Sequence, residues 1–411
     1  MKTFQKLTNR LNLNSFGRGV WVAAGVQGIR FLGLSMSFTY WPLYLYQERH
    51  IPMTMVGMIL LVSGVFSAVS QVAGGAMADR FGYRKMVIIG IAGETITATL
   101  LAILIGINSP TWSVILVAIL VPTLGEMATP AIQAIITEVT PTDRLTQSYA
   151  LMTVFGNLDW AIGPAAGGYL LGIISYGWLF GIATFISALS LIGVLFLPGD
   201  TIREDTERPS LTSLKSVISN RALLIFSGLS LLFFLTMAQW GSTLSVFAVD
   251  RIGFSAEQYG LLMSISGILI VVFQYPISRR IRPANTRKAL VFGSIFYGLG
   301  FLSFTWVRDF IPAIGSIVIL VIGEMLFVPT AYALVSQMSR PEDRGKNMGL
   351  YGLFNTLGIS IGPLLGGFLL DKYPTTPLYL WGPISLCSFA AAIGFAVWKG
   401  YSEKQNDGSI V

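Results

Sequence analysis

Long apolar stretches separated by short polar segments run through the whole 411-residue chain. A helix needs about 20 consecutive apolar residues to cross a bilayer, and twelve stretches come close to or exceed that length. The pattern therefore predicts an all-α membrane protein with twelve transmembrane helices. We expect these spans at residues 19–46, 54–78, 86–107, 111–138, 145–171, 176–197, 221–249, 257–279, 288–306, 311–338, 346–370 and 377–398.

One long polar segment, GDTIREDTERPSLTSLKSVISNR, interrupts this pattern between the sixth and seventh predicted spans. Its proline, serines and charged residues are typical of a linker. We therefore expect an N-terminal six-helix bundle at residues 1–198 and a central cytoplasmic linker at residues 199–220. A C-terminal six-helix bundle with a short cytoplasmic tail should follow at residues 221–411.

Both halves contain the same motifs in the same order. One run begins GEMATPAIQAIITEVTPTDR at Gly125, the other begins GEMLFVPTAYALVSQMSRPEDR at Gly323, and each continues to a GP..GG segment. A match of this length predicts two pseudo-symmetric six-helix bundles, and such internal repeats are typical of membrane transporters. Glu126 and Glu324 should then occupy equivalent places near the middle of the bilayer.

Charge supports this interpretation and adds an orientation. Charged residues make up 11% of the chain, against about 25% in soluble domains. With the N-terminus in the cytoplasm, Arg30 lies in a span, Arg49, Arg251, Arg308 and Lys372 face outward, and the other Lys and Arg residues face inward. Basic residues favour cytoplasmic loops, so we expect a multi-pass protein of the inner (plasma) membrane with both termini cytoplasmic.

The loop between the second and third predicted spans reads GGAMADRFGYRK. This loop and the two-halved pattern of twelve spans resemble the major facilitator superfamily, in particular its drug:proton antiporter branch. The resemblance implies a cytoplasmic gate in which Gly75 allows close helix approach, Asp79 meets the N-terminus of the eleventh span, and the basic residues face the cytosol. The signature Gly-x-x-x-Asp-Arg-x-Gly-x-Arg-Lys is carried by Gly75, Asp79, Arg80, Gly82, Arg84 and Lys85.

A second motif of that branch, Gly-x8-Gly-x3-Gly-Pro-x2-Gly-Gly, is complete on the eleventh span, where it begins at Gly349. On the fifth span, Ala150 and Asp159 replace its first two glycines. Glycine lets transmembrane helices approach closely, so we expect tight helix packing at this motif. Its residues are Gly163, Pro164, Gly167, Gly168, Gly358, Gly362, Pro363, Gly366 and Gly367.

Five charged residues lie in the interior of predicted spans, away from the span ends: Arg30, Glu94, Glu126, Asp159 and Glu324. A charged side chain at the bilayer centre costs about 2.5–3.5 kcal/mol, so each needs a partner, a water-filled cavity or a proton. Because a low dielectric favours the neutral form of a carboxylic acid, we interpret Glu126, Glu324 and Asp159 as proton-coupling groups. We expect Arg30 to pair with Glu126 or Asp159; the spacing does not choose between them and leaves a role for Glu94 open.

The resemblance implies that spans 1, 4, 7 and 10 line a central cavity. An acidic cavity with aromatic walls suits lipophilic cations, through charge and through cation–π attraction. The candidate lining residues are Gln27, Gln133, Gln239, Trp240 and Tyr332.

These features favour a secondary active transporter, a proton-coupled antiporter that exports amphipathic or cationic small molecules by alternating access. The alternative is a symporter or facilitator of a polar metabolite or organic anion, with Arg30 as the substrate clamp. An enzyme is disfavoured because the single histidine, His50, lies in an external loop and no lysine lies in the interior of a predicted span. We expect a monomer in the lipid bilayer, with no metal, no nucleic-acid partner and no cofactor besides the proton gradient.

Overall fold

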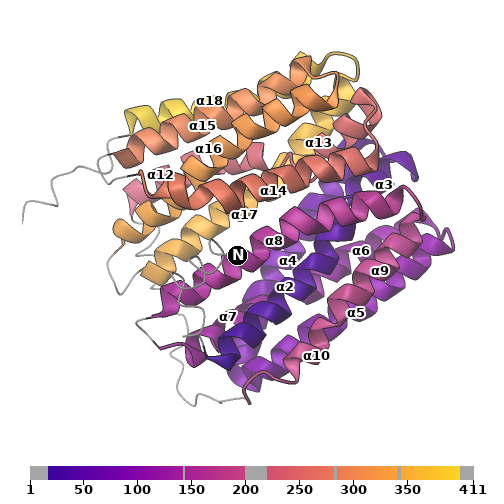
Figure 1. Cartoon of the computed structure of the whole chain (residues 1–411), viewed down its shortest axis with the longest axis vertical. Coiled ribbons are helices and arrows are strands. Elements are labelled where there is room, and N and C mark those ends of the chain that lie inside the picture. The colour runs from indigo at the N-terminus through magenta and orange to yellow at the C-terminus, as the bar shows by residue number, and fades with distance from the viewer. Residues whose placement is uncertain (1–16, 142–143, 200–219, 282–284, 340–343, 399–411) are drawn as a thin grey trace, which may run out of the picture. The chain divides into compact units, whose positions relative to one another are not determined.

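The computed structural model describes residues 17–141, 144–199, 220–281, 285–339 and 344–398, and within these residues the regular structure is helical (Figure 1). Ten helices or helix pairs in the described residues are long and apolar enough to cross a membrane. Most of the predicted central linker and both chain ends lie outside the described residues.

Helices occupy all six predicted spans of the first half. Three of these spans, the first, fourth and sixth, are each divided into two helices. The helices are α2 (Arg18–Phe38), α3 (Trp41–Gln47), α4 (Met53–Phe81), α5 (Tyr83–Gly106), α6 (Thr111–Gly125), α7 (Ala128–Val139), α8 (Leu145–Leu171), α9 (Tyr176–Ala188) and α10 (Ser190–Val194).

Helices also occupy the six predicted spans of the second half. They are α12 (Arg221–Met237), α13 (Thr243–Val246) with the π-helix η3 (Phe247–Ile252), α14 (Ala256–Ser278), α15 (Thr286–Ser303) with the short 3₁₀ helix η5 (Phe304–Trp306), α16 (Phe310–Gln337), α17 (Arg344–Lys372) and α18 (Pro377–Val397). The fifth and seventh predicted spans, at α8 and α12, are not among the ten apolar candidates. Helices nevertheless stand at both places, so the expected twelve-span fold fits the structure.

The fourth span breaks at the first GEM segment, whereas the tenth span continues through the second. Proline lacks an N–H group and its ring crowds the carbonyl four residues earlier. For Pro130 that carbonyl belongs to Glu126, and α6 ends there. For Pro329 it belongs to Met325, whose carbonyl accepts a 3.2 Å hydrogen bond from the Gln274 side chain of α14, and α16 stays unbroken.

Contacts group the described residues into two compact units. The first contains the described parts of Met1–Thr39 and Val65–Thr206, and the second those of Tyr40–Gly64 and Glu207–Val411. The start of α4 joins the second unit because Asp371 of α17 accepts hydrogen bonds from the backbone of Met53 (2.9 Å) and Thr54 (2.7 Å). The sequence pattern does not anticipate this grouping of residues 40–64, and the predicted division at 199–220 stays a prediction.

Two helices form the centre of the first unit. α2 packs on α8 and α9, and α5 packs on α6, α7 and α9. Small residues bring α2 and α9 together, since a Cβ on Gly33 would be 2.7 Å from the backbone nitrogen of Ser187. In the second unit, α12 packs on α17 and α18, and α15 packs on α16 and α18.

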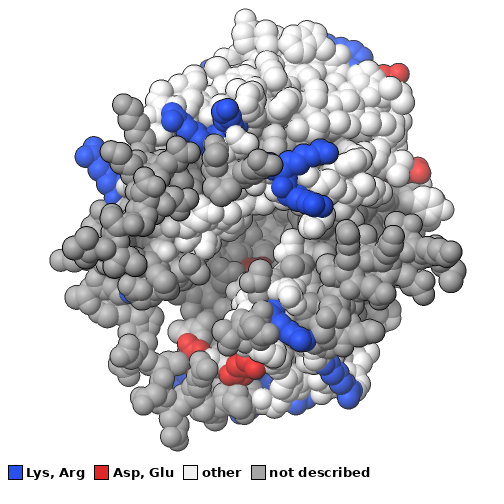
Figure 2. Space-filling view, turned by 60° about the vertical axis from the view of Figure 1, so that its left-hand side comes forward, with Lys and Arg blue, Asp and Glu red and all other residues white. Residues whose placement is uncertain are grey.

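The outer surfaces of the helices are apolar and the charged side chains gather elsewhere. Large apolar side chains such as Val72, Trp178 and Ile311 are at least 70% exposed, which suits contact with lipid tails. The face shown in Figure 2 carries many Lys and Arg side chains and fewer Asp and Glu side chains. Which side of the membrane each end faces stays a prediction.

Candidate transport site

The most buried charges of the chain meet between α2 and α5. Arg30 is 0% exposed and Glu94 is 1% exposed, and the Arg30 Nε donates to Glu94 Oε2 at 2.5 Å. Hydrogen bonds between ionised groups are strong, and more so away from water. The expected pairing of Arg30 with Glu126 is present only as a longer contact of 3.9 Å, and the closer partner, Glu94, was not expected.

Glu126 is a second, weaker partner of the same arginine. It lies at the break between α6 and α7, with its Oε1 3.9 Å from Arg30 Nη2 and its Oε2 accepting a 3.2 Å hydrogen bond from Gln71 Nε2. Its side chain is 24% exposed. Arg30 therefore lies between a fully buried carboxylate that it binds closely and a partly exposed one that it binds loosely.

The glycine of the first GEM segment makes room for this cluster. A Cβ on Gly125 would overlap the carboxylate of Glu94 and would be 2.5 Å from Arg30 Nη2. Gly125 is also the last residue of α6, and the carbonyls at a helix C-terminus carry partial negative charge. The break in the fourth span thus places Glu126 beside Arg30.

Asp159 of α8 lies apart from the cluster. It is 6% exposed, and its backbone carbonyl accepts a 3.0 Å hydrogen bond from Ser35 Oγ. Its buried Oδ2 has no hydrogen-bond partner among the described residues. Ser35 lies more than one helical turn beyond Arg30 on α2, which explains why the expected Arg30–Asp159 pair does not form.

Glu324 has neutral surroundings in the second unit. It is half-buried on α16, and within the described residues no salt bridge or hydrogen bond involves its carboxylate. The neighbouring Gly323 packs against α15, where a Cβ would be 2.6 Å from the nitrogen of Tyr297. Trp240 Nε1 donates to Tyr297 Oη at 2.7 Å. A neutral hydrogen bond therefore joins spans 7 and 9 close to the second GEM segment.

The five predicted cavity residues have different surroundings. Gln133 and Tyr332 are exposed and Gln27 is half-buried, with the Tyr332 hydroxyl accepting a 3.2 Å hydrogen bond from Asn355. Trp240 is buried at the link to Tyr297. These positions leave Gln27, Gln133 and Tyr332 as candidates to contact a ligand.

Gln239 serves the contact between α12 and α17 instead. It is fully buried, and its Nε2 donates to the carbonyls of Leu235 and Gly362, both at 2.9 Å. Its Oε1 accepts a 2.6 Å hydrogen bond from Thr243. Because the amide is fully engaged, our expectation that Gln239 lines a cavity does not fit the structure.

The glycine motif of the eleventh span forms a close helix contact. A Cβ on Gly362 would be 2.5 Å from Ala238 Cβ, and one on Gly366 would overlap Gln239 and Thr243. The other motif positions, Gly163, Pro164, Gly167, Gly168, Gly358, Pro363 and Gly367, are buried. The side chain of Ala150 lies outside the described residues.

We expect Gly362→Ala to destabilise the protein by about 1–3 kcal/mol, the usual cost of overpacking. Gly349→Ala is the matched control, because a Cβ there meets nothing within 4 Å. Thermal unfolding in detergent, followed by circular dichroism, measures both variants. Equal stability of the two variants would contradict a packing role for Gly362.

The signature loop joins α4 to α5 through Gly82, whose φ of 101° favours glycine. Close helix approach occurs at Gly74, where a Cβ would be 2.6 Å from Met127 Cα. At Gly75 the nearest atom would be Pro130 Cβ, at an ordinary 3.7 Å. Our expectation that Gly75 permits the close approach is therefore wrong by one residue.

The charged residues of the loop have local contacts. Asp79 Oδ1 accepts a 3.1 Å hydrogen bond from the Tyr83 hydroxyl. Arg84 Nη2 donates to the Leu195 carbonyl at 2.9 Å. Arg84 therefore binds the end of α10, a contact that the sequence did not predict. Arg80 and Lys85 are exposed. The predicted contact of Asp79 with the eleventh span stays a prediction.

Ten helices or helix pairs in the described residues are long and apolar enough to cross a membrane, and charged side chains are buried among them, as expected of a multi-span membrane protein. A sequence model of the Major Facilitator Superfamily matches residues 23–323 and 229–409. The chain therefore belongs to the Major Facilitator Superfamily and is a transporter, not an enzyme.

Relatives and solved structures agree with this assignment. The chain is 28% identical to the uncharacterised MFS-type transporter YttB of Bacillus subtilis (strain 168), over 85% of this chain and 88% of that protein. It is 22% identical to multidrug resistance protein 2 of the same organism, over 93% and 95%. A crystal structure of a POT family transporter has the same fold, with a TM-score of 0.76 at 17% identity, covering 92% of this chain and 96% of that one.

Proposed function

We propose that the protein is a proton-coupled antiporter that exports amphipathic cations by alternating access. The observation that carries the proposal is the excess of carboxyl groups over basic groups at membrane depth. Arg30 is close to both Glu94 and Glu126, whereas Asp159 and Glu324 form no ion pair within the described residues. A surplus of acid in a low-dielectric region attracts protons or organic cations and repels organic anions.

Glu126 and Glu324 are the best candidates for exchanging a proton with a cationic substrate. Each is only partly buried, so water or a ligand can approach the carboxyl group. Tyr332, two turns beyond Glu324 on α16, is 41% exposed and offers an aromatic face to a cation. The similarity to multidrug resistance protein 2 supports amphipathic compounds as the substrate class.

The alternative, in which Arg30 clamps an anionic substrate, is disfavoured by the surroundings of that residue. Arg30 is fully buried, and its Nε is bound to Glu94 at 2.5 Å. An anionic substrate would have to displace a buried carboxylate, which would then lack its counter-charge. We therefore interpret Arg30 as the internal counter-ion of the acidic residues.

We further propose that the protein lies in the plasma membrane with both termini in the cytoplasm, as the distribution of Lys and Arg favours, and that it acts as a monomer. Alternating access in this fold is largely a rocking of one half against the other. The proton gradient is then the only energy source the mechanism needs.

Reconstitution in liposomes with an acidic interior tests the proposal. As protons leave, a proton-coupled antiporter should accumulate externally added ethidium inside the liposomes, and a protonophore should abolish the accumulation. Protein-free liposomes are the control. Uptake of an organic anion, a sugar or a nucleoside in liposomes with an acidic exterior, with no response to ethidium under either gradient, would contradict the proposal.

A further inference from the structure

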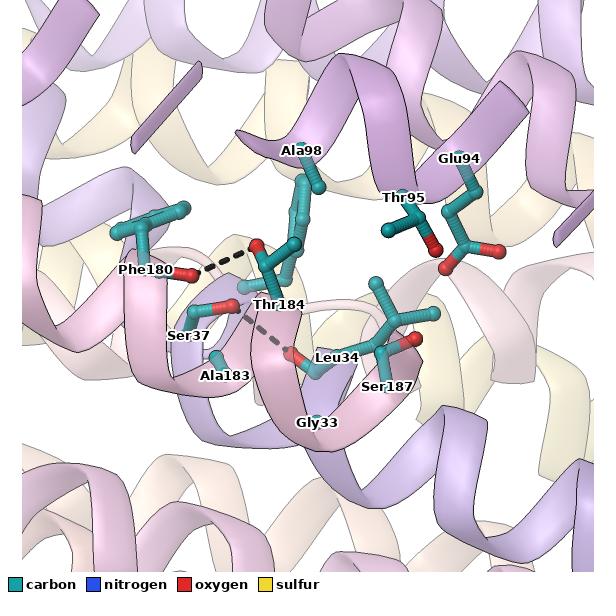
Figure 3. Close-up of a pocket in the computed structure, with 11 residues that line it drawn as sticks. Gly33, Leu34, Ser37, Glu94, Thr95, Ala98, Phe180, Ala183, Thr184 and Ser187 are labelled. Atoms are coloured by element: carbon teal, nitrogen blue, oxygen red, sulfur yellow. Dashed lines mark hydrogen bonds between the residues drawn. The ribbon is translucent and has the colours of Figure 1, made fainter. Parts of the chain in front are cut away.

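A small cavity lies beside Glu94, inside the first unit. It has a volume of about 10 Å³, which is close to the minimum for one water molecule. α2, α5 and α9 supply its walls. Figure 3 shows the carboxylate of Glu94 and the hydroxyl groups of Thr95 and Ser187 on the same side of the cavity, away from Phe180.

Three buried oxygen atoms at this cavity have no hydrogen-bond partner in the described part of the chain. They are Glu94 Oε1, Thr95 Oγ1 and Ser187 Oγ. Glu94 and Ser187 are each more than nine-tenths buried. The other oxygen of Glu94 binds Arg30, so Oε1 is the atom that could carry a proton and donate it to a hydroxyl group or to a water molecule.

The charges around Glu94 define a cluster of three groups. Arg30 reaches it from α2 and Glu126 from the junction of α6 and α7. α9 and α10, which also pack on α5, contain no acidic or basic residue, and the only charged residue of α7 is the exposed Glu138 at its far end. Two carboxyl groups therefore share one arginine.

We propose that Arg30, Glu94 and Glu126 form one cluster that holds a single proton, and that the cavity enables Glu94 to hold it. With both carboxylates ionised the cluster carries a net negative charge in a low-dielectric region, which one proton neutralises. When Arg30 turns from Glu94 to Glu126, the proton is on Glu94 Oε1, hydrogen-bonded within the cavity. This inference deepens the proposed role of Glu126 and rests on it.

Infrared difference spectra of the purified protein at acidic and alkaline pH test the proposal without any substrate. A neutral carboxylic acid gives a C=O band that its carboxylate lacks. In Glu94→Gln, Glu126 should pair with Arg30 and the proton should no longer be held, so the band of one carboxylic acid should disappear. Glu126→Gln should remove the same band, and the double variant should remove no more than either single variant.

Substitutions in the cavity separate its role from that of the ion pair and keep all three charged residues in place. Thr95→Val and Ser187→Ala remove the hydroxyl groups that would accept the proton of Glu94, so the band should titrate at lower pH, by about one unit if one hydrogen bond is lost. Thr184→Val is the matched control. Thr184 also lines the cavity, but its hydroxyl already donates to the Phe180 carbonyl at 2.7 Å, a bond drawn in Figure 3.

Three results would overturn the proposal. If the carboxylic acid band survived in Glu94→Gln and titrated over the same pH range, Glu94 would not be the residue that holds the proton. Separate losses that add up in the double variant would mean two independent protons. If the band titrated in Thr95→Val and Ser187→Ala at the same pH as in Thr184→Val, the cavity hydroxyl groups would have no role in holding the proton. Because the spectra require no transport, a failure of the proposed antiport would appear in the liposome experiment instead.

Discussion

Replacing Glu324 by glutamine is expected to abolish export driven by a proton gradient and to leave the folded protein intact. The amide keeps the size of the side chain but cannot take up or release a proton. Because no salt bridge of Glu324 exists among the described residues, the change leaves no charged partner unpaired. Ethidium accumulation in liposomes should fall to the level of protein-free liposomes.

Glu126→Gln should give the same loss of transport, because Glu126 is the partly exposed acid of the first unit. Glu257→Gln is a suitable control, since Glu257 is exposed in the first turn of α14. Circular dichroism and size-exclusion chromatography check that each variant folds. Full proton-driven export by both Glu126→Gln and Glu324→Gln would show that neither carboxyl group couples transport to protons.

The helical pattern could be predicted from sequence because membrane helices satisfy their backbone hydrogen bonds internally. Only their length and apolar character then need to be recognised. The equivalent depth of Glu126 and Glu324 that the two GEM segments indicate stays a prediction. The sequence repeat suggested equal structures there, but α6 ends at Gly125 whereas α16 continues through Glu324.

The partner of Arg30 was harder to predict, because depth along a span does not say which way a helix faces. Depth alone made Glu126 and Asp159 equal candidates and placed Glu94 nearer the membrane surface. The helices of the first unit fit together so that Glu94 of α5 reaches Arg30 of α2, and the lack of a side chain at Gly125 makes room for this contact. Such close contacts depend on how several helices fit together, which hydrophobic periodicity does not encode.

Gln239 illustrates the same limit in the second unit. A polar residue inside an apolar span indicates either a ligand site or a helix contact, and the two have the same sequence signal. The glycines at 362 and 366 on another span decide in favour of the contact, because they bring α17 within hydrogen-bonding distance of the Gln239 amide. The sequence contains both halves of this contact but not their register.

Arg30→Met is expected to destabilise the protein by about 3–5 kcal/mol, the typical effect of removing one partner from a buried ion pair. Glu94 would remain fully buried without its counter-charge and would have to take up a proton to remain inside. That uptake becomes more costly as pH rises, so the loss of stability should be larger at neutral than at acidic pH. Denaturant unfolding in detergent, followed by circular dichroism, measures the change.

The double variant Arg30→Met/Glu94→Met should recover much of this loss, because an apolar pair of similar size often replaces a buried ion pair at little cost. Arg18→Met is the control on the same helix. Arg18 is exposed, and its replacement should change stability by less than about 0.5 kcal/mol. The double variant could instead be no more stable than Arg30→Met. Arg30 would then stabilise the fold chiefly through Glu126 and Thr129, which lie 3.9 and 3.5 Å from its guanidinium. The main contacts of Arg30 would in that case be those at the break of the fourth span.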